Sequence, residues 1–332
     1  AMQLDGSNFK GEILLNLDTE DDDELSIGCA GGIDTNTKYT YTEEAVNAGS
    51  VHLTISIRGL LGGHSGMDID KGRGNANKLM NRILYHLLSL HEFQLVSIDG
   101  GSLRNAIPRE STTVLTVAKD DLKVVKAAIA EISETLKYEY KTIEKALAIS
   151  VEEKGAGDKA VAHEEMIKIV NVLYAVPNGV FRMSPDIDGL VETSSSLARV
   201  IVNDGSFVTQ SLQRSSVEST KADVANAIRA AFETAGIAVV QTGDYPGWQP
   251  NPNSEILTLM HQLYVKRFNE EPQIKACHAG LECGILGKHL PGVDMISFGP
   301  NIRAAHSPDE KVQISSVQKF WNYYLETFKR IA

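Results

Sequence analysis

Near its N-terminus the chain reads Ile13-Leu14-Leu15-Asn16-Leu17-Asp18-Thr19-Glu20, and near its C-terminus it reads Ala304-Ala305-His306-Ser307-Pro308-Asp309-Glu310. The first stretch is an apolar run that ends in a carboxylate, as a buried strand does when it leads into a functional loop. A carboxylate at a strand end (Asp18) and a histidine in a loop (His306) are typical ligands of a divalent metal ion. A catalytic metal ion normally takes three protein ligands and an open position, and little sequence precedes Asp18. We therefore expect most of a metallohydrolase whose N-terminal part is absent.

The composition bounds the class of protein and its partners. The 332 residues are enough for two domains and a large core. A formal net charge of -11 argues against a nucleic-acid partner, because binding phosphates requires a basic surface. No apolar run approaches the ~20 residues of a membrane span, and the N-terminus has no signal-peptide pattern. Cys29, Cys277 and Cys283 are few and odd in number, which indicates free thiols in a reducing cytoplasm and not a cysteine zinc site.

The middle of the chain alternates between strand and helix patterns. Residues 51–58 alternate and are β-branched, as in a half-buried strand, and 75–91 carry leucines and isoleucines at helical spacing. We expect strands at 12–18, 51–58, 93–99, 110–118, 190–202 and 206–213, and helices at 75–91, 120–148, 158–175 and 217–235. The acidic run 20–24 is expected to be a solvated loop. The repeated order of elements suggests two similar subdomains, although no close sequence repeat is visible.

The composition of the sequence changes at Gly243. Residues 244–254 are rich in Pro, Asn and Gly and predict a linker. Helix 254–268, strand 273–277, helix 280–286, strand 293–298 and helix 313–331 then alternate as in an α/β domain. We expect residues 1–30 and 244–332 to form one α/β domain, with 31–243 inserted as a second domain. This arrangement would bring Asp18 and His306 to one edge of a sheet.

Three further segments carry residues that are suited to chemistry. His64 lies in Gly62-Gly63-His64-Ser65-Gly66, where glycines let the backbone approach a ligand, although a tight turn with an exposed histidine fits equally well. Arg214 ends an alternating strand, where it either holds a carboxylate through two hydrogen bonds or forms a surface salt bridge. Asn105 lies in a second glycine loop beside Arg104.

The segment from Cys277 to Gly284 places His278, Gly280 and Glu282 near a strand-to-helix turn. Its backbone amides could bind an anion, and the alternative is a packed turn with a capping glutamate. Two common enzyme classes are excluded by pattern. The glycine loop lacks Gly-Lys-Ser/Thr, so it is not a Walker A loop, and the serines at 194–196 show no nucleophile-elbow pattern.

Taken together, the motifs resemble those of the bacterial aminoacyl-histidine dipeptidases (peptidase D, Xaa-His dipeptidases), which are cytosolic di-zinc exopeptidases of the carboxypeptidase-G-like group. The resemblance covers essentially the whole chain in order. Its motifs are Leu15–Glu20, Gly28–Gly32, Gly62–Gly66, Gly74–Leu79, Leu103–Glu110, Tyr245–Pro250, His278–Gly284 and His306–Glu310.

The resemblance implies an α/β fold, with a partial di-zinc exopeptidase-type catalytic domain and a large inserted α+β lid domain that also serves dimerisation. It implies two zinc ions per subunit, with Asp18 as a ligand of one and His306 as a ligand of the other. The family's His-x-Asp motif, bridging Asp and Glu-Glu pair have no counterpart here. By the same resemblance, His64 polarises the scissile carbonyl, Asn105 and Arg214 contact the substrate, and Gly280 and Glu282 lie in the loop near its carboxylate.

The implied activity is hydrolysis of Xaa-His dipeptides such as carnosine by a cytoplasmic homodimer. In the family the first Glu of the Glu-Glu pair is the general base. Because this base and several metal ligands are missing, we expect this polypeptide alone to have no activity or very weak activity. The alternative is a non-catalytic lid-containing module that binds or dimerises without metal. The resemblance leaves open whether His64 serves its own subunit or a partner.

Overall fold

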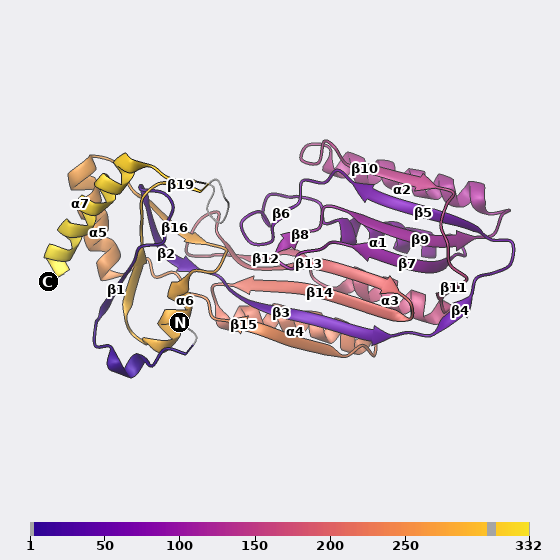
Figure 1. Ribbon diagram of the computed structural model, residues 1–332, viewed down its shortest axis with the longest axis horizontal. Helices are drawn as coiled ribbons and strands as arrows, with labels where there is room; N and C mark the ends of the chain where they lie inside the picture. Colours follow the sequence, from indigo (N-terminus) through magenta and orange to yellow (C-terminus); the bar gives the residue numbers. More distant parts are fainter. Residues whose placement is uncertain (1–2, 304–309, 332) are drawn as a thin grey trace.

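The computed structural model describes residues 3–303 and 310–331, which form two lobes joined at a narrow waist (Figure 1). The smaller lobe has a four-stranded sheet, in the order β1 (Ile13–Asn16), β17 (Asp294–Ser297), β2 (Glu24–Cys29) and β16 (Gln273–Cys277). Its helices are α5 (Glu255–Phe268), α6 (Glu282–His289) and α7 (Ile314–Ile331). The core of this lobe is rich in aromatic side chains, among them Tyr264, Phe298 and Tyr323.

The larger lobe is built on one antiparallel sheet of nine strands. Along the sheet the strands are β10 (Ala148–Glu152), β5 (Val51–Arg58), β9 (Ser111–Val117), β7 (Gln94–Gly100), β13 (Val191–Asn203), β14 (Ser206–Ser215), β3 (Gly31–Thr40) and β15 (Val239–Tyr245), with β12 (Gly179–Met183) paired to β13. Helices α1 (Ala76–Leu88), α2 (Leu122–Tyr140), α3 (His163–Ala175) and α4 (Glu218–Thr234) lie against one face of the sheet (Figure 1). Three short pairs complete the elements: β4 (Glu43–Ala45) with β11 (Lys159–Val161), β6 (Gly63–His64) with β8 (Ala106–Ile107), and β18 (Ile302–Arg303) with β19 (Lys311–Val312).

The two halves of this sheet have the same topology. Each half follows the order strand, helix, strand, strand, helix, strand, and the sheet orders β10-β5-β9-β7 and β15-β3-β14-β13 are equivalent. The first half, with the β4 strand, is inserted between β3 and α3 of the second. The halves meet where β7 pairs antiparallel with β13, from Ile98↔Val202 to Gly100↔Val200. One chain therefore presents loops from both halves at the same end of the sheet.

Several sequence-based expectations of local structure need correction. The strands β2 and β3 were not predicted, and the expected helix 120–148 ends at Tyr140, followed by a turn and β10. The strand β3 was not predicted because its inward side chains are polar. Thr35 and Thr37 are buried and form hydrogen bonds with Gln213 and Thr209 on β14. The linker predicted from residue 244 begins after Tyr245, because β15 runs that far along β3.

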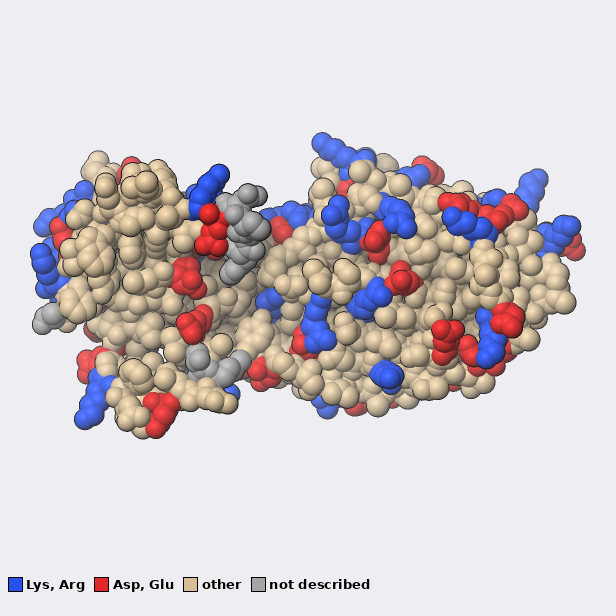
Figure 2. Space-filling model, in the orientation of Figure 1, with Lys and Arg blue, Asp and Glu red and all other residues tan. Residues whose placement is uncertain are grey.

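The surface bears on possible partners. On the face shown in Figure 2, Lys and Arg side chains are interspersed with Asp and Glu, so this face has no continuous basic tract. None of the helices in residues 3–303 and 310–331 has the length and apolarity that a bilayer crossing requires. Helix α7 leaves Ile314, Trp321 and Phe328 more than half exposed, so the smaller lobe presents an apolar stripe.

Candidate functional site

The candidate site lies at the waist, where a row of residues crosses the larger sheet. Register pairs Tyr245 with Gly32, Gly32 with Arg214, and Arg214 with Ser194. Residues directly opposite each other on neighbouring strands direct their side chains to the same face. Gly32 has no side chain, so the ring of Tyr245 lies over it, and the Tyr245 hydroxyl accepts a hydrogen bond from Arg214 Nη1 at 2.9 Å. The sheet thereby delivers one tyrosine and one arginine to a common point.

Arg214 is the dominant charge of this row. Its side chain is only 4% exposed, and no carboxylate within the described part of the chain forms an ion pair with it. Its Nε is buried without a hydrogen-bond partner there. A buried guanidinium without a counter-ion is costly, and an anionic ligand would compensate it. The local structure thus favours the binding of an anion.

His64 meets Arg214 from a different part of the chain. Its Nδ1 accepts hydrogen bonds from the backbone N–H groups of Gly66 and Met67, at 3.2 and 3.1 Å. The proton of the neutral imidazole therefore lies on Nε2, which is 3.4 Å from Arg214 Nη2. Both nitrogens carry hydrogen, so they do not bond each other but face a common position that an oxygen atom could occupy.

Electrostatics keep His64 neutral. Burial, and then the nearby Arg214 charge, lower the pKa of His64 below its ordinary value, against a smaller opposing effect of Asp68. A neutral histidine with a fixed tautomer is a hydrogen-bond donor of constant orientation near neutral pH. The pair therefore offers one fixed dipole and one full positive charge to the same oxygen position.

The smaller lobe reaches this cluster through His278. His278 is 6% exposed, and its Nε2 lies 2.7 Å from Ser194 Oγ of the larger lobe. Burial, followed by the charge of Arg214, lowers the pKa of His278 to about 3, so this histidine is neutral in the folded protein. The loop of His64 touches the same segment, since a Cβ on Gly66 would lie 2.0 Å from the carbonyl oxygen of His278.

Of the remaining residues predicted for the site, Asn105 and Gly280 lie at the edge of this cluster, and Glu282 lies two positions beyond Gly280 in the chain. The carbonyl of Asn105 accepts a hydrogen bond from the N–H of Ser65 at 2.8 Å, and its side chain is exposed. Gly280 lies against the ring of Tyr245, because a Cβ there would be 3.3 Å from Tyr245 Cε2. Glu282 is the exposed first residue of α6, and no side chain caps that helix, so the alternative of a capping glutamate is wrong.

The predicted metal ligands are placed only in part. Asp18 follows β1 and is exposed. Burial, and then the charges of Cys29 and Asp18, raise the pKa of Cys283 to about 12, which places Asp18 near the start of α6. His306 lies outside the described residues. Among residues 3–303 and 310–331, no three His, Cys, Asp or Glu side chains group closely enough to hold a metal ion. The described residues therefore do not by themselves fit a complete zinc pair.

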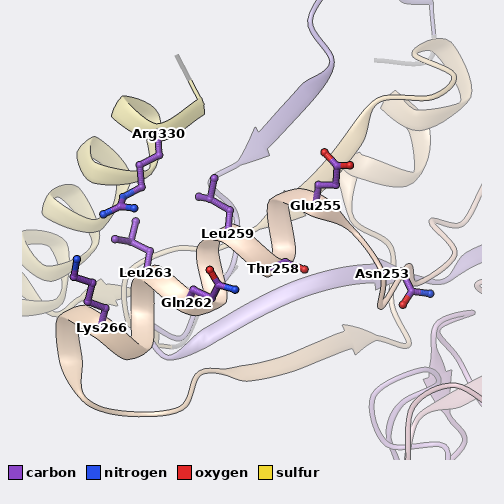
Figure 3. Close-up of a pocket in the computed structure, with 8 residues that line it drawn as sticks. All are labelled: Asn253, Glu255, Thr258, Leu259, Gln262, Leu263, Lys266 and Arg330. Carbon is purple, nitrogen blue, oxygen red and sulfur yellow. The ribbon is translucent and has the colours of Figure 1, made fainter.

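A separate hollow of about 590 Å³ lies along α5 (Figure 3). Thr258, Gln262 and Lys266 of α5 line it, with Arg330 of α7 at one end. It shares no lining residue with the cluster at the waist. We therefore assign the functional site to the waist and not to this hollow.

The comparisons with known proteins agree with this geometry. Residues 117–330 match the sequence family described as peptidase family M20/M25/M40, and residues 55–144 match the peptidase dimerisation domain. The chain belongs to the M20/M25/M40 family of peptidases. Family membership confirms both the α/β fold class and the resemblance to dipeptidases that the motifs indicated.

Two relatives define the likeness further. The chain is 39% identical over 331 residues to the cytosol non-specific dipeptidase of Escherichia coli (strain K12), covering 100% of this chain and 68% of that protein. It superposes on the crystal structure of aminoacylhistidine dipeptidase from Vibrio alginolyticus with a TM-score of 0.93 and 39% identity, covering 97% of this chain and 66% of that one. The chain thus spans about two thirds of the length of each relative.

Sequence reasoning missed two members of the cluster as site residues. Tyr245 falls in the segment 244–254 that was predicted to be a linker, and the pattern of that segment gives no sign that its second residue ends a strand. His278 was noted in its turn, but its contact with Ser194 joins residues 84 positions apart in different lobes. The Tyr245–Pro250 motif was the one available signal for this region.

Gly32→Ala should disrupt the row. A Cβ at Gly32 would lie 2.6 Å from the Tyr245 hydroxyl, so the ring must leave Arg214. Overpacking of this kind costs about 1–3 kcal/mol of unfolding free energy, which denaturant titration measures. The matched control is Gly11→Ala, whose Cβ would meet nothing closer than 3.8 Å and should change stability little. Equal stability of the two variants would contradict the close contact.

His278 should make the folded protein sensitive to acid. Its folded pKa of about 3 lies below the value near 6.5 of an unfolded histidine, so the unfolded state binds more protons between these values. The free energy of unfolding should therefore be undiminished above about pH 6.5 and fall as the pH decreases toward 3. In His278→Gln, thermal unfolding followed across this pH range should give a shallower dependence. An unchanged dependence would show that His278 is not buried as a neutral group.

Proposed function

We propose that the protein is a metal-dependent dipeptidase whose waist site binds the substrate and stabilises negative charge on the scissile carbonyl. The observation that carries the proposal is the pair of donors, His64 Nε2–H and Arg214 Nη2–H, that face one position from 3.4 Å apart. Donors fixed in advance around a developing oxyanion lower the barrier of acyl transfer, typically by a few kcal/mol each. The family is one of metallopeptidases, and both relatives described above are named dipeptidases.

Each residue has a proposed role within that reaction. His64 donates to the carbonyl oxygen as it becomes negative, with its tautomer fixed by two backbone amides. Arg214, supported by Tyr245, holds the substrate and contributes its charge to the same oxygen. Asn105 and Gly280, at the edge of the cluster, and Glu282, at the start of α6, are proposed to contact the substrate. Because His64 and Arg214 meet within one chain, we propose that His64 serves its own subunit.

Zinc is the proposed metal. Asp18 and His306 are proposed to be among the ligands of a pair of zinc ions. A bound ion of this kind supplies an activated water and polarises the carbonyl. The described residues contribute only Asp18 to such a set, so no step above passes through the metal. The proposed substrates are dipeptides of the Xaa-His type such as carnosine, the proposed location is the cytoplasm, and the proposed assembly is a homodimer, for which the dimerisation-domain match is the support.

The domain division is also proposed. Residues 1–30 and 244–332 would form the part of the protein that carries the metal ligands, and residues 31–243 the lid, with two similar subdomains. The equivalent sheet orders of its two halves support that internal repeat.

A second function of a different class is a lid-containing module that binds peptides or dimerises without catalysis. The lack of a complete ligand set among the described residues favours it. A dipeptide assay with added Zn²⁺ separates the two. Turnover that disappears with chelator supports the peptidase, whereas saturable dipeptide binding without turnover supports the module.

In a form of the protein that carries the complete set of metal ligands, His64→Ala should lower kcat for a dipeptide by about 10²-fold or more, the usual cost of one lost oxyanion donor, with little change in KM. Zinc content should not change, because Nδ1 of His64 already accepts two backbone hydrogen bonds and Nε2 carries the proton. Arg214→Met should instead raise KM together with a loss of kcat, while folding persists, because the variant removes an uncompensated buried charge.

The control for both variants is His163→Ala, an exposed histidine at the start of α3. It should match the wild type in kcat, KM and zinc content. Loss of zinc in His64→Ala would make that residue a ligand, and an unchanged kcat would favour a structural turn.

A further inference from the structure

Loop 61–74, which carries His64, is closed at its base by a single buried carboxylate. Glu144 lies in the turn after α2 and is 3% exposed. Its Oε2 accepts a hydrogen bond from the backbone N–H of Leu61, and its Oε1 accepts one from the N–H of Gly74, each at 2.8 Å. The two amides are the first and last of the loop. One side chain therefore holds both ends of the segment together.

The loop has little other means of keeping its shape at that end. Gly62, Gly63 and Gly72 have positive φ, and the loop contains no long helix or strand, so its backbone is permissive. A backbone of this kind has high conformational entropy when its ends are free. The middle of the loop pairs with β8, Gly63 with Ile107 and His64 with Ala106. The clamp acts at the base, where it fixes the two ends from which this pairing starts.

Inside the loop, a second set of contacts connects the two ends of the loop to His64. Arg73, next to Gly74, donates from Nη1 to the carbonyl of Gly62 at 2.6 Å and pairs through Nη2 with Asp68 at 3.1 Å. Asp68 accepts the backbone N–H of His64 at 2.8 Å. A continuous path of peptide bonds, hydrogen bonds and one ion pair therefore runs from the base of the loop to the backbone of His64.

We propose that Glu144 is a positioning residue for His64: it clamps loop 61–74 so that His64 Nε2 faces the same oxygen position as Arg214. This proposal rests on the proposed function of His64. Glu144 makes no recorded contact with the cluster at the waist, and its two carboxylate oxygens are already occupied by backbone amides. It acts on the reaction only through the loop, where a displacement of about 1 Å can cost up to about 10²-fold in rate.

The decisive variant is Glu144→Gln, which keeps the size of the side chain but sets an amide donor against one of the two backbone donors. We expect kcat for a dipeptide to fall about tenfold or more with KM nearly unchanged, since the loop becomes mobile while Arg214 stays in place. Glu144→Asp retains the charge but is too short to reach both amides, and it should give a smaller loss. The control is Glu134→Gln on α2, an exposed residue that pairs with Lys137 and should behave as wild type when changed.

Two readouts separate positioning from a general loss of structure. In a His64→Ala background, Glu144→Gln should cause no further loss of kcat, because there is no imidazole left to position. In NMR titrations, Glu144→Gln should move the pKa of His64 back toward 6.5 as the ring leaves its buried place beside Arg214, and Glu134→Gln should leave it unchanged. Additive losses of kcat, or an unmoved His64 resonance in a folded variant, would overturn the proposal.

The NMR arm also distinguishes this inference from the function on which it rests. If His64→Ala proves fully active, the proposed function fails, yet a shifted His64 resonance in Glu144→Gln would still establish the clamp. If His64→Ala is impaired but Glu144→Gln and Glu144→Asp leave both kcat and the resonance unchanged, the clamp is wrong and the function stands.

Discussion

The site depends on the buried, uncompensated positive charge of the Arg214 guanidinium. It is held by the tyrosine hydroxyl of Tyr245 and faces the imidazole of His64, but no carboxylate of the described residues compensates its charge. Such a charge is unfavourable in the free protein and favourable once an anionic group binds. Burial, and then this charge, lower the pKa of His64 and of His278, so the two histidines around Arg214 are neutral. This cation thus favours an anionic ligand and adds to the effect of burial on the protonation of its neighbours.

The fold places that charge among residues from distant parts of the chain. The continuous sheet brings loops from its two equivalent halves to one end, so His64 of the first half meets Arg214 of the second. Glycines make the approach possible, because side chains at Gly32 or Gly66 would collide with Tyr245 or His278. The smaller lobe adds His278 through its contact with Ser194. The site is therefore a product of sheet register and of the contact between lobes.

The local sequence pattern was enough to identify a site residue where that residue's neighbours in sequence also form its surroundings in the fold. The glycines around His64 and the strand end at Arg214 marked both residues as candidates. The helices of the larger lobe and its strands β5, β7, β9, β13 and β14 followed from the sequence patterns. Contacts between distant segments left no such trace. The strand β3 was hidden by buried threonines whose partners lie on β14, and Glu144 fell within the length of a predicted helix. Residues that act through long-range hydrogen bonds are the ones that a single sequence does not reveal.

The central claim is that burial and the neighbouring charge of Arg214 keep His64 neutral, with its proton on Nε2, and the most direct test is ¹⁵N NMR of the His64 ring as a function of pH. The wild-type protein should show the Nε2–H tautomer and a pKa below 6.5, and Arg214→Met should raise that pKa by removing the neighbouring positive charge. A wild-type pKa at or above 6.5, an Nδ1–H tautomer, or a pKa that does not respond to Arg214→Met would contradict the account.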